Sequence, residues 1–430
     1  MKICVIGGGS TYTPELISGF INLSDQLPVD EICLMDIDPY RLDSVGGFIE
    51  RYCATKKVNF KVSKTDILEF AIQGASYVIT QVRVGMMNAR KNDEYLGKKY
   101  GIIGQETTGI GGMAKAIRTI PVILEVANTI RKVAPKAVLI NFSNPSGLVT
   151  EALQTFAPDV ISVGLCNAPY HAKMKFLDIF QQATNQTIDP SRAQLNTLGL
   201  NHLSWNRGLF IDGKDKWQIV LKHFLQQLKT VSNPEWDPKL IENLGMVPNN
   251  YLHYYYDTNK MLALQEEWPP SRAETVQMVE QELLRDYSNS EKVDLPEGLM
   301  SRGGAYYSTV ATQLINSHFN QLSNIHIVNT RQNNAVPGIA EDWVMEMPCI
   351  VDDRGFTPIP TSPLPLSVSG LMTQIKSYEK LTAIAAVTGN RQMLYQAILT
   401  HPLGPNVDKI PDMINDLLEI NKPLLPNFWS

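Results

Sequence analysis

The sequence predicts an α/β protein in which a doubly wound parallel sheet is followed by an α+β domain. Short apolar runs alternate with helix-like stretches over about the first 165 residues, and the first run breaks into consecutive glycines. After residue 170 the pattern changes to longer helices. Short apolar runs are typical of strands buried on both faces, and their alternation with helices is typical of a parallel sheet.

Five apolar runs are the expected strands of the first domain. They span Ile3–Ile6, Ile32–Met35, Tyr77–Val82, Val138–Phe142 and Val160–Leu165. Helical patterns lie between them at Pro14–Leu23 and Met113–Val133. Because 430 residues exceed what one hydrophobic core usually covers, we expect two domains, residues 1–168 and residues 169–430.

The turn after the first strand is typical of a dinucleotide site. It consists of Gly7, Gly8, Gly9 and Ser10. Glycines let the backbone approach a pyrophosphate, and the helix that follows offers free N–H groups. The second strand ends at Asp36, whose carboxylate would bind the adenosine ribose and repel a 2′-phosphate. The pattern favours NAD in a Rossmann-type domain, although Tyr12 replaces the third glycine and a plain strand–helix turn is the alternative.

Composition excludes several classes of function. The chain is 44% hydrophobic and 19% charged, with a net charge of -5, which argues against a nucleic-acid partner. No apolar stretch reaches the roughly 18 residues that would span a membrane. The first strand starts at the N-terminus, which predicts no signal peptide, and five scattered cysteines are typical of reduced thiols. We therefore expect a cytoplasmic enzyme.

Polar residues follow several predicted strands, at the edge where parallel sheets bind ligands. Arg83 follows the third strand, Asn144 the fourth and Cys166 the fifth. A glycine-rich loop at residues 101–112 adds the polar run 105–108, which we expect to face the cofactor or the substrate. The alternative for this segment is a mobile surface loop.

Cys166 and His202 are candidate metal ligands. A thiolate and an imidazole bind borderline divalent metals, and only two protein ligands would leave positions open for substrate oxygens. The alternative for Cys166 is a buried core cysteine with no functional role. The residues alone leave both interpretations open.

Several motifs, in the same order along the chain, resemble glycoside hydrolase family 4. They occupy residues 7–15, 104–109, 141–147, 166–169, 199–202, 251–255, 302–304 and 401–405. The resemblance is strongest to the NAD- and metal-dependent 6-phospho-β-glucosidases. Members that act on α-glycosides place an acid after the metal cysteine, whereas this chain has Asn167.

The resemblance implies hydrolysis of 6-phospho-β-glucosides, such as cellobiose 6-phosphate, to glucose 6-phosphate by redox-assisted elimination. NAD⁺ takes hydride from C3, and the metal polarises the ketone and acidifies the proton on C2. A tyrosinate removes that proton, the C1–O bond breaks, water adds, and the hydride returns to C3. The substrate would be a phosphorylated disaccharide or an aryl 6-phospho-β-glucoside.

The matching positions imply individual roles. Cys166 and His202 would bind the metal, Mn²⁺ by family resemblance, with Tyr251 as the base and Glu106 raising its basicity. The substrate-binding positions would be Arg90, Asn144, Asn167 and Arg272. Without the resemblance, Tyr251 would be one of several packed tyrosines, and the arginines would be surface ion pairs.

The resemblance also carries expectations about organisation, and alternatives remain. It implies a lactate/malate dehydrogenase-like NAD domain at residues 1–168, and a domain at 169–430 that binds substrate and metal and forms a homodimer or homotetramer. Asn167 cannot donate a proton, so no residue is assigned as the acid for the leaving group. The alternatives are a 6-phospho-α-glucosidase or another glycosidase of the family, an NAD-dependent 2-hydroxy acid dehydrogenase, and a non-catalytic NAD-binding redox sensor.

Overall fold

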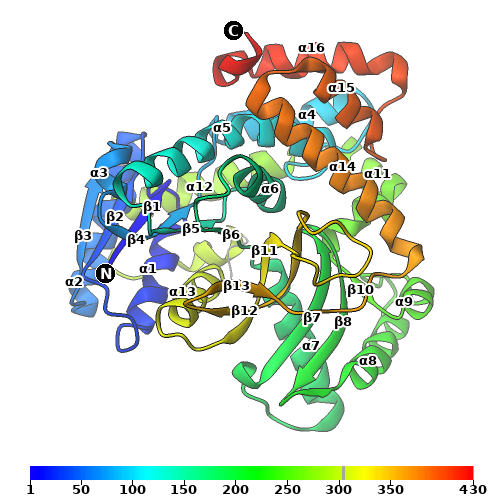
Figure 1. Cartoon of the computed structure of the whole chain (residues 1–430), viewed down its shortest axis with the longest axis horizontal. Helices are drawn as coiled ribbons and strands as arrows, with labels where there is room; N and C mark the ends of the chain where they lie inside the picture. Colours follow the sequence, from blue (N-terminus) through cyan, green and yellow to red (C-terminus); the bar gives the residue numbers. More distant parts are fainter. Residues whose placement is uncertain (303–305, 430) are drawn as a thin grey trace.

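The computed structural model describes residues 1–302 and 306–429, and it confirms the α/β class. The described strands form one sheet with helices on both sides (Figure 1). Its strand order is β10-β8-β7-β12-β11-β6-β5-β4-β1-β2-β3, with β13 paired to β12 and β9 paired to β8. Gly303 and Gly304 of the family motif lie outside the described residues.

The N-terminal half of the sheet is parallel and has the Rossmann order 3-2-1-4-5-6. Its strands are β1 (Lys2–Ile6), β2 (Glu31–Met35), β3 (Lys61–Thr65), β4 (Ala75–Thr80), β5 (Val138–Asn141) and β6 (Ser162–Gly164). The connecting helices are α1 (Thr13–Asn22), α2 (Pro39–Lys56), α3 (Leu68–Ile72), α4 (Met86–Lys99), α5 (Gly109–Val133) and α6 (Ser146–Phe156). The five strands predicted from apolar runs are confirmed, and β3 is an additional edge strand.

The sheet continues without a break into an antiparallel half. β11 runs antiparallel to β6 through the pair Asn329 and Gly164. The strands of this half are β7 (Ala193–Leu200), β8 (Leu203–Ile211), β9 (Lys214–Asp215), β10 (Val247–Pro248), β11 (Asn324–Arg331), β12 (Val344–Asp352) and β13 (Gly355–Pro358). One sheet thus crosses the expected boundary at residue 168, and the division into two domains stays a prediction.

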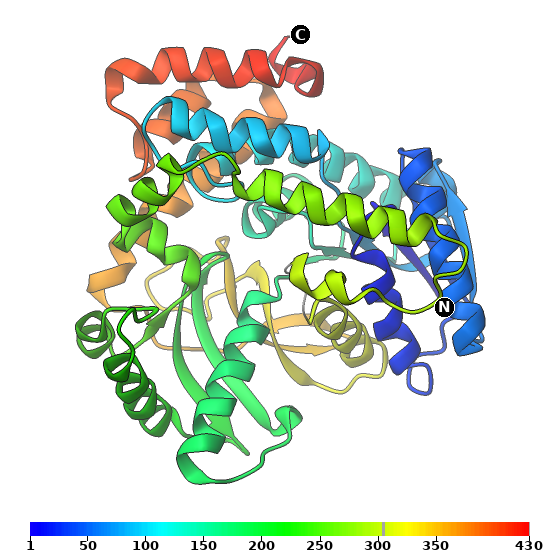
Figure 2. The ribbon, with the colours of Figure 1, turned by 180° about the vertical axis from the view of Figure 1, so that it is seen from behind.

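The helices after residue 168 surround the antiparallel half and reach back over the parallel one. They are α7 (Ala168–Thr184), α8 (Trp217–Thr230), α9 (Pro238–Leu244), α10 (His253–Tyr256), α11 (Thr258–Glu266), α12 (Arg272–Ser288), α13 (Tyr307–Phe319), α14 (Leu366–Thr388), α15 (Arg391–Thr400) and α16 (Ile410–Ile420). From behind, α12 runs beside α4 and toward α2 (Figure 2). It therefore extends along the parallel half of the sheet.

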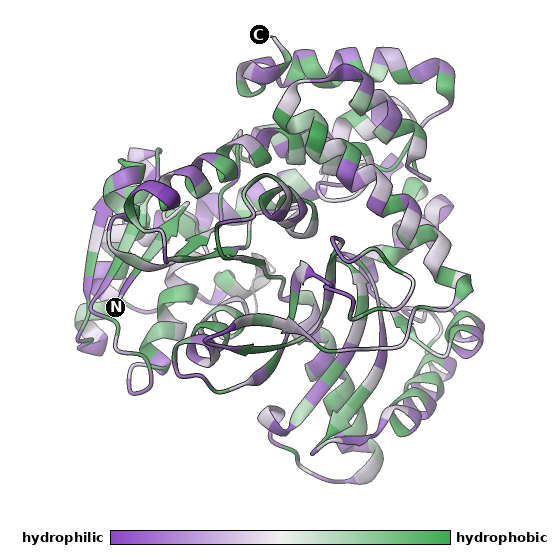
Figure 3. Ribbon diagram, in the orientation of Figure 1, coloured by the Kyte–Doolittle hydropathy of each residue, from purple (hydrophilic) through white to green (hydrophobic). Residues whose placement is uncertain are grey.

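One large cluster of buried apolar side chains runs through both halves of the sheet and the helices packed on them. Ile3, Cys4 and Val5 of β1 are fully buried, as are Ile32, Cys33 and Leu34 of β2. Figure 3 shows predominantly apolar strands at the centre and more polar helices outside. This burial on both faces explains why the strands read as continuous apolar runs. No helix in the described part of the chain is long and apolar enough to cross a membrane.

Candidate active site

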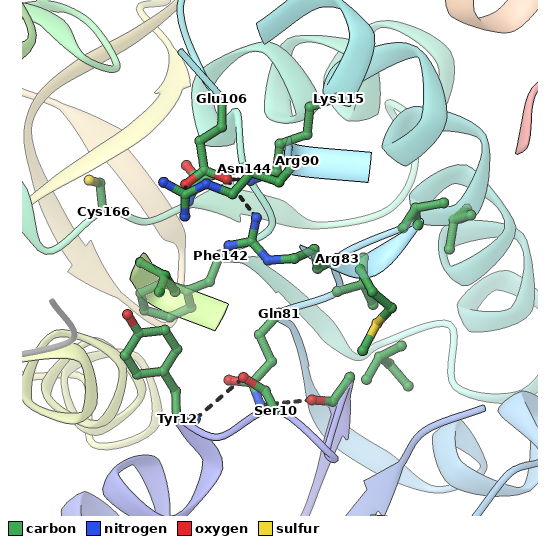
Figure 4. Close-up of a pocket in the computed structure, with 18 of the residues that line it drawn as sticks. Ser10, Tyr12, Gln81, Arg83, Arg90, Glu106, Lys115, Phe142, Asn144 and Cys166 are labelled. Carbon is green, nitrogen blue, oxygen red and sulfur yellow. Dashed lines mark hydrogen bonds and ion pairs between the residues drawn. The ribbon is translucent and has the colours of Figure 1, made fainter. Parts of the chain in front are cut away.

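The carboxyl ends of the parallel strands open into a cavity of about 1090 Å³. Most of the site residues expected from the sequence line it: Gly7, Ser10, Asp36, Arg90, Glu106, Asn144, Cys166, Asn167, His202, Tyr251 and Arg272. Gly8 and Gly9 belong to the same turn but do not line the cavity. Figure 4 shows labelled residues from the turn after β1, from the ends of β4 to β6 and from the loop before α5 around one space.

The turn after β1 forms one end of the cavity. Gly7 has φ +84°, a conformation that favours glycine, and a Cβ on Gly8 would lie 2.8 Å from Cβ of Leu34. Gly9 N donates to Asp36 Oδ2 at 2.9 Å. Burial raises the pKa of Asp36, although these backbone contacts oppose that shift. The glycine turn, which has no side chains to block a ligand, and Asp36 after β2 fit a dinucleotide with free ribose hydroxyls.

Three cations surround Glu106 deeper in the cavity, as Figure 4 shows. Its Oε2 accepts from Arg83 Nη1 at 2.6 Å and from Lys115 Nζ at 2.7 Å. Its Oε1 lies 3.0 Å from Arg90 Nη1. Burial opposes ionisation of Glu106, but the three cations overcome this and hold its pKa well below the usual range. The carboxylate therefore stays charged and fixes the three cationic side chains.

Lys115 is a member of this cluster that the sequence did not reveal. Its side chain is 4% exposed. Burial, together with Arg83, lowers the pKa of Lys115 to about 7. For Arg83, the sequence indicates only a position at the end of a strand. A helical lysine and a loop glutamate nine residues apart carry no pattern that predicts their contact.

Glu94 connects Arg90 to the helical turn that carries Arg272, and both arginines were predicted to bind substrate. Its Oε1 accepts from Arg90 Nε at 2.9 Å, and its Oε2 accepts from Ala273 N at 2.8 Å. It thereby connects α4 to the first turn of α12, where Arg272 is the first helical residue. Arg90 is buried between Glu94 and Glu106, whereas Arg272 is exposed and has no ion-pair partner among the described residues. Of the two, Arg272 has the more available charge.

Cys166 and His202 meet at the other side of the cavity. Cys166 follows β6, and His202 lies in the two-residue turn between β7 and β8 with φ +65°. Cys166 Sγ lies 3.6 Å from His202 Nε2. With metal–ligand bonds of roughly 2.0–2.3 Å, donors at this separation subtend a near-tetrahedral angle at one ion. Residues 1–302 and 306–429 supply no third His, Cys, Asp or Glu to such a group.

The protonation of the pair also suits a metal. Burial lowers the pKa of His202 to about 3, so its imidazole is neutral at physiological pH. Burial, with a contribution from Glu346, raises the pKa of Cys166 to about 12. The thiol would therefore lose its proton only when a cation binds beside it. The donor set fits a divalent metal with open positions.

Tyr251 packs directly on His202. Its ring stacks on the imidazole of His202, with centroids 3.7 Å apart and planes 3° apart. Asn249 Oδ1 accepts from Tyr251 N at 3.1 Å and caps the short helix that carries it, Asn250–Leu252. Burial raises the pKa of Tyr251, and nearby Arg90 opposes the shift. A tyrosinate here would need further positive charge.

The two asparagines lie at neighbouring strand ends. Asn144 follows β5 and accepts from Ser146 N through Oδ1 at 3.3 Å. Asn167 immediately precedes α7, and both side chains are half-buried on the wall of the cavity. Their amides can donate to sugar hydroxyls and accept from them.

Comparisons with known proteins agree over nearly the full chain. The model for family 4 glycosyl hydrolases matches residues 2–182, and the model for the family's C-terminal domain matches residues 197–404. A probable 6-phospho-beta-glucosidase of Bacillus subtilis is 40% identical, covering 100% of this chain and 98% of that protein. The 6-phospho-beta-glucosidase of Thermotoga maritima is 35% identical, covering 98% and 99%.

Solved structures support the same assignment. The Thermotoga maritima 6-phospho-beta glucosidase, determined with manganese, NAD+ and glucose-6-phosphate, has a TM-score of 0.89 at 33% identity, covering 99% of each chain. A malate dehydrogenase from Plasmodium falciparum has a TM-score of 0.53 at 12% identity, covering 90% of this chain and 98% of its own. The latter likeness shows the fold alone and confirms the expected dehydrogenase-like architecture. The chain belongs to glycosyl hydrolase family 4.

Proposed function

We propose that this protein is a 6-phospho-β-glucosidase that requires NAD and a divalent metal, for which Mn²⁺ is the candidate. It hydrolyses 6-phospho-β-glucosides, such as cellobiose 6-phosphate or aryl 6-phospho-β-glucosides, to glucose 6-phosphate. The observation that carries the proposal is one cavity lined by a dinucleotide turn, a Cys/His pair and a tyrosine. Full-length relatives at 33–40% identity are named 6-phospho-β-glucosidases.

When bound, the nicotinamide exchanges hydride with C3 of the sugar, and the metal acts as a Lewis acid on the neighbouring oxygen. Gly7, Ser10 and Asp36 hold the nucleotide, and Cys166 and His202 hold the metal. Free ribose hydroxyls suit the Asp36 carboxylate, which repels a 2′-phosphate and so selects NAD over NADP.

Tyr251 removes the proton from C2. The ring of Tyr251 stacks on His202, so its phenolic oxygen lies beside the proposed metal ligands. Burial opposes the tyrosinate form, and positive charge from Arg90 and from the metal position favours it. Glu106 acts on this base through the cations that it fixes, because its oxygens bond Arg83, Arg90 and Lys115.

Arg272 and Arg90 bind the 6-phosphate, and Asn144 and Asn167 contact the sugar. A guanidinium fork is the side chain best suited to a phosphate dianion. Asn167 follows Cys166 at the position where family members that act on α-glycosides have an acid. An asparagine cannot protonate the leaving group, so this position favours β-glycosides. A 6-phospho-α-glucosidase of the same family is the second candidate.

Two further expectations belong to this proposal. Residues 1–168 bind NAD, and residues 169–430 complete the substrate and metal site and assemble the chain into a homodimer or homotetramer. The protein acts in the cytoplasm, where a reduced thiol at Cys166 persists. The five cysteines are scattered and odd in number, which is typical of reduced thiols.

The test is an assay of chromogenic 6-phospho-β- and 6-phospho-α-glucosides with and without NAD⁺ and Mn²⁺, alongside malate. We expect turnover of the β-anomer only when both cofactors are present, without net NADH formation. Preference for the α-anomer would support the second candidate. Stoichiometric NADH from malate would indicate a dehydrogenase. Full activity after exhaustive chelation and removal of nucleotide would refute the proposal.

A further inference from the structure

The loop between α4 and α5 contacts two parts of the site through adjacent residues. One part is the group of cationic side chains around Glu106, and the other is the pair of proposed metal ligands, Cys166 and His202. Glu106 bonds the cations, while Gln105 and Thr107, on either side of it, bond each other. Thr107 N donates to Gln105 Oε1 at 2.6 Å, and Thr107 Oγ1 donates to the same oxygen at 2.9 Å. A hydroxyl has one proton, so this bond uses the only proton that Thr107 can donate.

The remaining lone pairs of Thr107 Oγ1 face His202. Thr107 Oγ1 lies 3.0 Å from His202 Nδ1. Since the hydroxyl proton is already committed to Gln105, Nδ1 must carry the ring proton and donate it to Thr107. The other ring nitrogen, Nε2, then keeps its lone pair, and it is the atom that faces Cys166 Sγ at 3.6 Å. This tautomer is the one that can bind a metal beside the thiolate.

The loop is held in this shape by its packing against α5. A Cβ on Gly111 would lie 2.2 Å from Gln105 O, and a Cβ on Gly112 would lie 2.7 Å from Thr107 C. The glycines therefore let the first turn of α5 pack directly against the loop backbone. A short antiparallel bridge between Gln105 and Thr108 closes it. The Thr107 hydroxyl is thus presented to His202 from a fixed position.

We propose that Gln105 and Thr107 are positioning residues that hold His202 as the Nδ1-protonated tautomer for metal binding. The inference rests on the proposed metal site, and it gives individual roles to two residues of the polar run 105–108. Because Tyr251 stacks on His202, the same contacts also fix the plane of the proposed base. Partners of this kind typically contribute 10- to 100-fold to metal affinity.

The test compares Thr107→Val, which keeps the shape but removes the hydroxyl, with Thr107→Ser, which keeps the hydroxyl. Mn²⁺ is titrated calorimetrically into the full chain loaded with NAD⁺. We expect Thr107→Val to raise the Mn²⁺ Kd about 10- to 100-fold and Thr107→Ser to restore most of the affinity. Thr129→Val, on α5 with a hydroxyl bonded to Glu125 O, is the matched control and should bind Mn²⁺ like the parent.

A second readout observes the tautomer directly. In metal-free protein with ¹⁵N-labelled histidine, the His202 signals, assigned by comparison with His202→Asn, should show a protonated Nδ1. They should shift toward the other tautomer in Thr107→Val and Gln105→Met. Melting temperatures and NAD⁺ affinity of each variant separate this effect from misfolding. A Thr107→Val protein that does not fold leaves Gln105→Met and the parent tautomer as the deciding measurements.

The outcomes are distinct. Parent-like Mn²⁺ affinity in Thr107→Val, an equal loss in Thr107→Ser, or an Nε2-protonated His202 in the parent would each overturn the positioning role, with the proposed function intact. Failure of the parent itself to bind Mn²⁺ saturably would overturn the metal site and this inference together.

Discussion

Arg272 and Arg90 are both proposed to bind the substrate phosphate, yet their surroundings predict different behaviour on substitution. Arg272 is exposed at the start of α12 and has no ion-pair partner among the described residues, so Arg272→Met should remove phosphate binding alone. A lost charge-assisted contact is worth about 2–4 kcal/mol. That corresponds to a KM raised about 30- to 900-fold for the phosphorylated substrate. Stability should change by no more than about 0.5 kcal/mol.

Arg90→Met should weaken phosphate binding and also destabilise the fold. Arg90 is buried and bonds Glu94 at 2.9 Å and Glu106 at 3.0 Å. Removing it leaves buried carboxylates with fewer partners, which costs about 3–5 kcal/mol.

Steady-state kinetics on a chromogenic 6-phospho-β-glucoside and equilibrium urea unfolding measure the two effects separately. Arg285→Met, at an exposed position further along α12, is the control and should change neither. An unchanged KM in Arg272→Met would refute the phosphate assignment. Equal stability losses in the two variants would refute the distinction between a free and a buried arginine.

Two further predictions concern buried carboxylates. Glu106→Gln should cost about 3–5 kcal/mol of unfolding free energy, because buried Arg90 and Lys115 and half-buried Arg83 lose their shared partner. Glu242→Gln, in an exposed pair with Lys229, should cost under about 1 kcal/mol. Similar losses in urea unfolding would contradict the cluster. Burial raises the pKa of Glu346 to about 7 from an ordinary 4.5, so the folded state binds more protons between these values. Stability should therefore fall as pH rises from about 4.5 to 7, by up to about 3 kcal/mol, and Glu346→Gln should flatten that part of the profile. An unchanged slope in this variant would contradict the assignment.

The sequence predicted the parallel half of the fold because its strands are buried on both faces. β1, β2, β4 and β5 are almost entirely apolar and are therefore visible as runs. β3 reads Lys-Val-Ser-Lys-Thr, and its residues are exposed or half-exposed at the edge of the sheet, so it carries no such signal. β7 and β8 are interrupted by polar residues, among them Thr197 and Asn206, which bond each other across the hairpin. These interruptions hid the hairpin that carries His202.

The site was predicted by resemblance more than by spacing. Cys166 and His202 are separated by 36 residues, and only the antiparallel continuation of the sheet brings them within 3.6 Å. Lys115 could not be found from the sequence, and Thr107 was predicted only as part of the polar run 105–108, because their individual contacts depend on side-chain direction. Lys115 points from a helix to Glu106, and Thr107 reaches a histidine 95 residues away. Contacts between distant segments leave no local pattern.

Tyr251 is proposed to remove the proton from C2 of the sugar, and Tyr251→Phe tests this role. This variant keeps the ring that stacks on His202 but lacks the ionisable oxygen. It should fold, bind NAD⁺ and metal, and lose roughly 10²–10⁴-fold in turnover. Near-parental rates would show that another group is the base.

The most direct measurement follows the C2 hydrogen during turnover of a 6-phospho-β-glucoside by the parent enzyme. A substrate deuterated at C2 should react more slowly, and glucose 6-phosphate formed in deuterated water should carry deuterium at C2. A glycosidase that uses two carboxylates never breaks the C2–H bond. Product without deuterium at C2, together with equal rates for the protiated and deuterated substrates, would contradict the account.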